Sequence, residues 1–367
     1  MRTSPMRERW KRMQVAALLK EAVAGTEQDF TEGNLTRGIA LLAIPTILEM
    51  LMESTFAVVD AFWVARLGAE AMAATGLTEA IVVLVYAVAV GLAMAASATV
   101  ARRIGEKDKE GASIAVVQSV ALAIGAGVVM GAAGAWYAPQ LLGLMHAEPG
   151  VISKGSGFAR IVLGGNVVIV MLFLINGIFR GAGDATLAMR TLWLANAINI
   201  VLDPCLIYGW GPFPALGVTG AAVATTTGRT IGVLYQFRML YRGDGRFEIA
   251  RRHLRLNADV MRRLLRLART AMFQNFITTA SWVSLARINA RFGSAAVAGY
   301  SLAIRIILFA LMPSWGICAA AATLVGQNLG AKKPERSERA VWLAGFYNMG
   351  FLTLVGALFF AAAPALV

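Results

Sequence analysis

The sequence predicts an all-α, polytopic membrane protein with two parallel repeats of six helices, of which the second is incomplete. The first observation is composition: 58% of the 367 residues are hydrophobic, 15% are charged, and the mean hydropathy is +0.65. Soluble domains contain about 45–50% apolar residues. The second observation is a series of apolar runs long enough to cross a bilayer, and the third is a long internal duplication.

We expect nine membrane-spanning helices, because nine apolar runs have about the 20 residues that a bilayer crossing needs. Hydrocarbon offers no water to backbone polar groups, so each span must be helical. The runs are continuously apolar rather than alternating, which excludes a transmembrane barrel of strands. The expected spans are residues 39–63, 73–99, 112–136, 157–179, 187–209, 217–240, 264–287, 297–325 and 339–362.

The duplication has a period of 225 residues, too long for a solenoid repeat. Residues 65–105 recur without a gap as residues 290–330, so that Gly91 corresponds to Gly316. Six spans precede the second copy, and six is an even number. The second copy should therefore start on the same side of the membrane, with a pseudo-twofold axis along the membrane normal.

Positive charge is concentrated in three loops, and the formal net charge is +13. Residues 238–269 contain ten arginines and no lysine, and residues 102–109 and 332–339 are also basic. Counting spans places all three on the side of the N-terminus, which the positive-inside rule identifies as the cytoplasm. A pI near 10.3 could suggest nucleic-acid binding. Topology and attraction to anionic lipid explain the same charge, so we expect membrane lipid and no nucleic acid as partners.

These patterns divide the chain into four parts. We expect a cytoplasmic N-terminal tail at 1–36, an N-lobe at 37–240, a basic cytoplasmic linker at 241–261 and a partial C-lobe at 262–367. The second copy reaches Val367, the counterpart of Leu142, which follows the third span of the first copy. Counterparts of the fourth to sixth spans are therefore not expected in this sequence.

Three carboxylates share one face of the first span. At about 100° per residue, Glu53 lies about 40° from Glu49, and Asp60 lies about 20° from Glu49. Charges inside a bilayer are costly and rarely face lipid. Glu49 could instead be a solvated helix-end charge, and Asp60 a cap near the outer end. The functional interpretation places Glu53 and Asp60 in a cation- or proton-binding site and Glu49 in a substrate cavity.

The fifth span carries a second polar stripe, because Asn196, Asn199 and Asp203 fall within about 60° of arc. Amides and an acid in one stripe suit a water-filled cavity that holds a cation or proton, and Asn176 of the fourth span adds another amide. We assign Asn196 to the substrate cavity and the other three to the cation site. The alternative is polar contact between helices, worth about 0.6 kcal/mol per pair.

The second copy lacks the acids of the first span. Their positions hold Gln274, Thr278 and Leu285. If the lobe needed the acids in order to fold, both copies should contain them. Their absence favours a specialised cation or proton site in the N-lobe, with Gln274 and Thr278 facing the substrate cavity.

No catalytic residue and no metal site is expected. His146 and His253 have no Cys or His partner at metal-ligand spacing and are interpreted as loop residues. No nucleophile–His–acid set is present, so we expect no enzyme activity. Gly181-Ala-Gly183 follows a helix rather than a strand, which excludes a dinucleotide fingerprint. No Walker-type loop is present, so ATP is not the direct energy source.

Several motifs together resemble the multidrug and toxic compound extrusion (MATE) family. The resemblance extends from about Leu35 to the end of the sequence, and it is specific in combination rather than in any single motif. The matching residues are Ile44-Pro45 with Asp60 and Gly68 downstream, Asn176 to Asp184, Asn199 to Pro204, Gly220 to Thr225, Pro313 to Gly316, and Leu324 to Gly330.

The resemblance implies a MATE/MOP-type fold of twelve helices in two lobes with a central cavity between them. It further implies export of organic, often cationic, compounds driven by inward H⁺ or Na⁺ flow, with no other cofactor. By position, Asp60 and Asp203 match the family's N-lobe cation-site acids, Asn176 and Asn199 its amides, and Thr225 a polar member of the sixth helix. One subgroup has a carboxylate on the seventh helix, where this chain has Gln274-Asn275, which favours the DinF-like branch.

We therefore expect a cation-coupled antiporter that exports small organic compounds by alternating access, as a monomer in the inner (plasma) membrane with a cytoplasmic N-terminus. Burial favours the protonated form of a carboxyl group, which makes proton binding at the two aspartates feasible. A lipid-linked saccharide flippase of the same superfamily is the alternative, and it should line its cavity with arginines. A membrane-embedded enzyme and a transport-inactive fragment are the other two alternatives.

Overall fold

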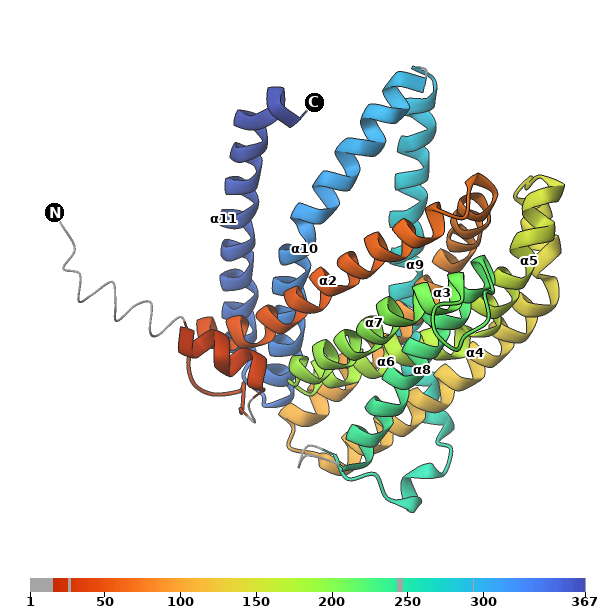
Figure 1. Cartoon of the computed structure of the whole chain (residues 1–367). Helices are drawn as coiled ribbons and strands as arrows, with labels where there is room; N and C mark the ends of the chain where they lie inside the picture. The colour runs from red at the N-terminus through yellow and green to blue at the C-terminus, as the bar shows by residue number, and fades with distance from the viewer. Residues whose placement is uncertain (1–15, 26–27, 243–246, 293, 367) are drawn as a thin grey trace.

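The computed structural model describes residues 16–25, 28–242, 247–292 and 294–366, and these ranges contain helices and no strand (Figure 1). Residues 16–24 form a short helix before the first long one. The remaining elements are α2 (Leu35–Ala65), α3 (Ala69–Gly105), α4 (Lys109–Leu144), α5 (Pro149–Gly164), α6 (Asn166–Gly181), α7 (Ala185–Tyr208), α8 (Val218–Arg242), the 3-10 helix η1 (Arg251–Leu254), α9 (Ala258–Ala290), α10 (Ser294–Gly330) and α11 (Pro334–Leu366).

A long helix or helix pair lies at each of the nine expected spans. Within the described ranges, six helices are long and apolar enough to cross a membrane, or seven if the α5–α6 pair, bent by 41°, counts as one span. The other two, α8 and α9, are long but more polar. The first half of α9 carries four arginines, and α8 contains a threonine-rich segment followed by Arg229. Composition alone therefore supports fewer spans than the nine expected.

The helix boundaries reproduce the duplication. The bounds of α10 lie 225 residues beyond those of α3, and the first residue of α11 lies 225 beyond that of α4. The connecting turns match as well, because Lys107 and Lys332 both have positive φ, at 57° and 59°. The two copies therefore fold alike, which confirms the two-lobe architecture predicted from the repeat.

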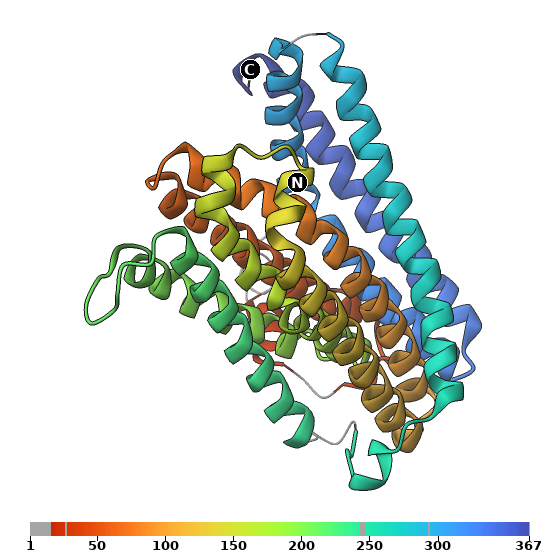
Figure 2. The same ribbon diagram turned by 90° about the vertical axis from the view of Figure 1, so that its right-hand side faces the viewer.

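The two lobes meet through pairs of equivalent contacts, and Figure 2 shows α9, α10 and α11 grouped beside the N-lobe helices. Gly91 of α3 lies against Met272 of α9, and Gly316 of α10 lies against Ile47 of α2. Gly316 lies 225 residues after Gly91, and Met272 lies 225 residues after Ile47. The interface therefore has the pseudo-twofold symmetry expected of parallel repeats.

The segment before α2 bridges the two lobes at the end where α3 meets α10. On the N-lobe side, Thr186 donates a hydrogen bond to the carbonyl of Ala22 at 3.0 Å. On the C-lobe side, Lys333 donates to the carbonyl of Thr31 at 3.1 Å, and Arg336 to that of Glu32 at 2.7 Å. This bridging segment, residues 16–25 and 28–34, is therefore fixed to both lobes.

The described part of the linker between the lobes packs on α4. Gln118 donates to the carbonyl of Arg255 at 2.9 Å and accepts from the amide of Asn257 at 3.0 Å. His253 lies in η1, is buried, and its Nε2 is 2.8 Å from Glu110. The expected loop histidine therefore anchors the linker. Residues 243–246, within the predicted linker, lie outside the described ranges.

Candidate functional site

The three acids of α2 lie on one continuous helix. Asn34 caps its first turn by accepting from the amide of Thr36 at 2.8 Å. Continuous helical geometry from Leu35 to Ala65 keeps the acids on a common face, as the sequence predicted. Each acid meets a different set of partners from the neighbouring helices, so the polar residues form three successive groups along α2.

The first group joins α2, α7 and α8 around Asp60 and Asp203. Asn199 donates to Asp203 Oδ1 at 3.3 Å and to Thr225 Oγ1 at 3.0 Å. Asp203 is fully buried, and the charge of Asp60 acts on it. Gly228 packs against the backbone carbonyl of Ala195, which brings α8 close enough to α7 for the Thr225 contact.

This group contains buried oxygen atoms without donors. Asp60 Oδ1, Asn199 Oδ1 and Asp203 Oδ2 are buried and accept no hydrogen bond from any described residue. Unsatisfied buried polar atoms are rare in native proteins and call for an explanation such as an ion, a proton or water. Carboxylate, amide and hydroxyl oxygens are the ligands that hard cations prefer. The residues present therefore fit a small cation or a shared proton.

The second group surrounds Glu53. Asn196 donates to Glu53 Oε2 at 3.0 Å, and Arg229 Nη2 lies 3.8 Å from Glu53 Oε1. Arg229 also donates to the hydroxyl of Tyr86 at 3.3 Å. Its charge acts on Asp60 as well, so Arg229 lies between the first and second groups. The structure therefore places Glu53 beside Asn196 and an arginine.

The third group is a buried ion pair. Arg180 Nη1 lies 2.9 Å from Glu49 Oε1. Asn176 donates to the same oxygen at 3.3 Å and accepts from Gln236 at 2.7 Å. The sequence-based assignment grouped Asn176 with the aspartates, but its hydrogen bonds connect it to Glu49. Glu49 is buried with a cation as partner, so the alternative of a solvated helix-end charge does not describe it.

Comparison with known proteins places the fold in a family. The sequence pattern of the MatE family matches residues 45–205 and 270–367, more than half of the chain. The chain belongs to the MatE family. This confirms the resemblance seen in the motifs and, with it, a multi-pass membrane transporter.

Curated relatives of this MatE chain include probable multidrug resistance proteins and an FAD transporter. It is 26% identical over 319 residues to a probable multidrug resistance protein NorM of Thermotoga maritima, covering 87% of this chain and 68% of the relative. It is 26% identical over 321 residues to an FAD transporter of Shewanella oneidensis, covering 86% and 70%. These relatives support an efflux transporter.

Solved structures of transporters have the same fold as this chain. A MOP superfamily transporter from Pyrococcus furiosus has a TM-score of 0.84 and 29% identity, covering 92% of this chain and 74% of that one. An outward-facing multidrug resistance MATE family transporter has a TM-score of 0.83 and 29% identity over the same shares.

The two cavity residues assigned to the C-lobe lie apart from the three N-lobe groups. Gln274 and Thr278 on α9 are exposed, and Thr278 bonds within its own helix to the carbonyl of Gln274 at 3.0 Å. No hydrogen bond in the described part of the MatE chain connects them to the acids of α2. The structure therefore leaves their assignment to a substrate cavity as a prediction.

Sequence reasoning missed three residues of the site. Arg229 and Tyr86 belong to the Glu53 group, and the charge of Glu79 on α3 acts on Asp60. Arg229 and Glu79 carry the signal that identified the acids of α2, since each is a charge inside an apolar span. Arg180 lay within the Asn176 to Asp184 motif without a role of its own, and its side chain reaches Glu49.

Proposed function

We propose that this MatE chain is a cation-coupled antiporter that exports organic, often cationic, compounds by alternating access, with H⁺ or Na⁺ bound at Asp60 and Asp203. One contrast within the N-lobe supports the coupling site. Glu49 and Glu53 have arginine partners, whereas the two aspartates form no ion pair with any described residue. Arg229 also acts on Asp60, but its ion pair is with Glu53. The two neighbouring carboxyls therefore have no cation of their own and repel each other, so a bound proton or Na⁺ would be favoured there.

The mechanism follows from where the two carboxyls lie. Asp60 belongs to α2 and Asp203 to α7, two helices that are also joined by the hydrogen bond from Asn196 to Glu53. Neutralising the pair would remove the repulsion between α2 and α7 and let them approach. Ion binding would thereby favour one arrangement of the N-lobe over another. In an antiporter that arrangement is the one that releases the exported compound outward.

Asn199 and Thr225 would complete the cation site. Na⁺ would use the amide and hydroxyl oxygens together with the carboxylates, whereas a proton would need only the aspartates. Asn176 forms hydrogen bonds with Glu49 and Gln236, so in this proposal it is not a direct ligand of the cation. We place the protein in the inner membrane as a monomer, with the basic loops and the N-terminus in the cytoplasm.

An exporter of anionic, phosphate-bearing compounds is a second candidate, because one relative is an FAD transporter and two arginines lie inside the N-lobe. A pyrophosphate would need guanidinium groups that are free to bind it. Arg180 and Arg229 are engaged by Glu49 and Glu53, respectively. The ion pairing therefore favours cationic over anionic substrates, and likewise disfavours a flippase for pyrophosphate-linked saccharides.

The test is efflux from proteoliposomes under an imposed H⁺ or Na⁺ gradient, with an organic cation and with FAD as substrates. Asp60→Asn and Asp203→Asn remove the titratable charge at nearly unchanged size, and we expect each to abolish gradient-driven efflux while insertion and folding persist. Asp259→Asn, an exposed position at the start of α9, is the matched control and should pump normally. Wild-type rates for both aspartate variants under both gradients would refute the coupling site. Efflux of FAD but not of the cation would favour the second candidate.

A further inference from the structure

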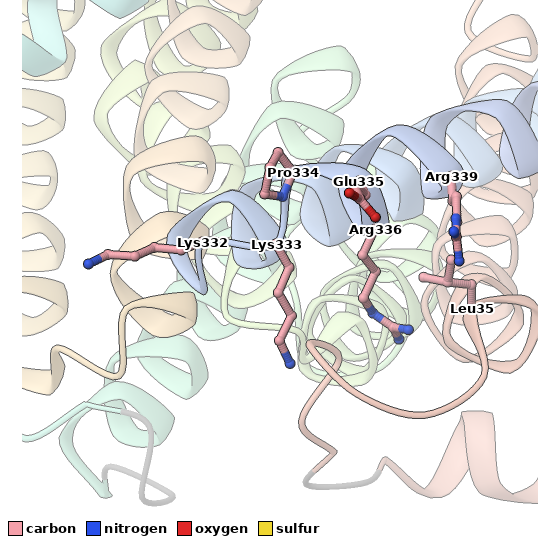
Figure 3. Close-up of a pocket in the computed structure, with 7 residues that line it drawn as sticks. All are labelled: Leu35, Lys332, Lys333, Pro334, Glu335, Arg336 and Arg339. Atoms are coloured by element: carbon pink, nitrogen blue, oxygen red, sulfur yellow. The ribbon is translucent and has the colours of Figure 1, made fainter.

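A basic cavity lies at the start of α11, beside the bridging segment. Its volume is about 430 Å³. Four of the residues that line it are cations and one is an acid, so positive charge dominates. The lining residues are Leu35, Lys332, Lys333, Pro334, Glu335, Arg336 and Arg339 (Figure 3). In Figure 3 the side chains of Lys333, Arg336 and Arg339 extend from one side of α11.

Two of these four cations are held in position by protein contacts, and the side chains of the other two, Lys332 and Arg339, form no ion pair in the described ranges. Lys333 and Arg336 donate to carbonyls of the bridging segment, which fixes their side chains, and Lys333 Nζ also lies 3.7 Å from Glu32 Oε1. Arg336 Nε is nevertheless buried and has no acceptor among the described residues. Arg339 forms no hydrogen bond or ion pair with any residue of the described ranges. The cavity thus combines fixed positive charge with donors that lack a partner.

The first copy of the duplication provides an internal comparison. At an offset of 225 residues, Lys333, Arg336 and Arg339 correspond to Asp108, Gly111 and Ile114. Asp108 caps α4 there by accepting from the amide of Gly111 at 2.8 Å. Because α4 and α11 begin at equivalent positions, the turn does not need the three cations in order to form. At these three positions only the second copy carries cations.

A cytoplasmic location explains why the turn before α11 carries positive charge, but it does not explain why the cations line one cavity. The corresponding turn of the first copy also lies beside basic residues, with Arg102, Arg103, Lys107 and Lys109 close in sequence. Arg102 and Arg103 are paired there with Glu106, at 3.0 and 2.8 Å, and Arg103 is also paired with Asp108 at 3.2 Å. Surface cations that are paired with acids can thus be enough to set the orientation of the protein in the membrane. Fixing the bridging segment likewise accounts for Lys333 and Arg336 but not for Arg339.

We propose that this cavity binds the phosphate group of an anionic phospholipid headgroup. Arginine and lysine clusters recognise phosphate through charge-assisted hydrogen bonds. Basic pockets at the cytoplasmic ends of membrane helices are typical sites for anionic headgroups. Trp342 follows Arg339 by one turn of α11, is 62% exposed and packs against Phe346. Tryptophan is enriched at the interfaces of a bilayer, which supports a location of the cavity at the depth of lipid headgroups.

The experiment measures lipid binding to the purified protein in a neutral detergent by native mass spectrometry. Short-chain phosphatidylglycerol and phosphatidylcholine are titrated separately, and inorganic phosphate is added in a third arm. Arg339→Gln removes one unpaired cation, and the double variant Arg336→Gln/Arg339→Gln removes two of the four cations that line the cavity. The control is Lys107→Gln/Lys109→Gln, which removes two cations from the equivalent turn of the first copy.

We expect preferential binding of one phosphatidylglycerol by the wild type. Binding should weaken about fivefold in Arg339→Gln and about thirtyfold in the double variant, from about 1 kcal/mol per cation near the headgroup. The control should change less than twofold. Arg339→Gln leaves the bridging segment bonded, so a loss in this variant cannot come from loosening that segment.

Three outcomes would overturn the proposal. Equal loss in the control would mean that overall charge, not the cavity, attracts the lipid. No preference of the wild type for phosphatidylglycerol over phosphatidylcholine would mean that no anionic headgroup binds. Displacement of phosphatidylglycerol by millimolar inorganic phosphate would assign the cavity to a soluble phosphate compound instead of a lipid.

Discussion

Gly105 of α3 and Gly330 of α10 occupy equivalent positions on opposite sides of the contact between the lobes. A Cβ on Gly105 would collide with the backbone carbonyl of Gln327, and one on Gly330 with that of Arg102. Gln327 and Arg102 are themselves related by 225 residues. Two backbones approach closely at each of these points, which is the role of small residues between membrane helices.

The first prediction concerns this contact. Gly105→Ala and Gly330→Ala should each destabilise the protein by about 1–3 kcal/mol, because the added methyl group must displace backbone rather than a side chain. The measurement is the apparent thermal unfolding midpoint in detergent. Gly125→Ala is the control, since no atom lies within 4 Å of its added Cβ. If Gly125→Ala lowered the midpoint as much as the other two variants, close backbone contact would not explain the loss of stability.

The second prediction concerns the ion pair between Glu49 and Arg180. Arg180→Gln should lower stability by about 3 kcal/mol, because it leaves the buried Glu49 carboxylate without a cation. Adding Glu49→Gln should recover much of that loss, since an uncharged amide is less costly to bury. A double-mutant cycle on thermal stability measures the coupling, and purely additive losses would contradict it.

The third prediction concerns the bridging segment. Arg336→Gln removes the donor to the carbonyls of Glu32 and Gly33, at 2.7 and 3.0 Å. Amide hydrogen exchange in residues 28–34 should therefore accelerate, whereas α2 should change little. Arg339→Gln is the matched control, because it makes no bond to the segment. Equal acceleration in both variants would show that the hydrogen bonds do not hold the segment.

The fourth prediction concerns topology. Cysteines introduced at Lys332 and at Leu254, which is 62% exposed, should resist an impermeant maleimide in intact cells and react after permeabilisation, because both lie in basic regions. A cysteine at Phe213, in the loop between α7 and α8, should react from outside. Cys205 and Cys318 are first replaced by alanine. Labelling of position 332 or 254 in intact cells would show that the orientation is the reverse of the predicted one.

The sequence by itself determined the helical membrane architecture and the duplication, because both depend on local properties. Continuous apolar runs in lipid permit only helices, and a repeat is visible in the residues themselves. The shared face of Glu49, Glu53 and Asp60 followed from helical periodicity alone. The contact of Asn199 with Asp203 is likewise one turn of one helix.

Only the tertiary structure decided which partner each acid has. Arg180 and Glu49 are 131 residues apart in sequence, and Arg229 and Glu53 lie on different helices, so no local pattern connects them. Packing of α7 and α8 against α2, with Arg180 reaching Glu49 from α6, gives two acids an arginine partner and leaves Asp60 and Asp203 without an ion pair in the described ranges. The same holds for the basic cavity, whose walls come from Leu35 and from residues 332–339. Periodicity specifies the face on which a side chain lies, whereas helix packing specifies what that face meets.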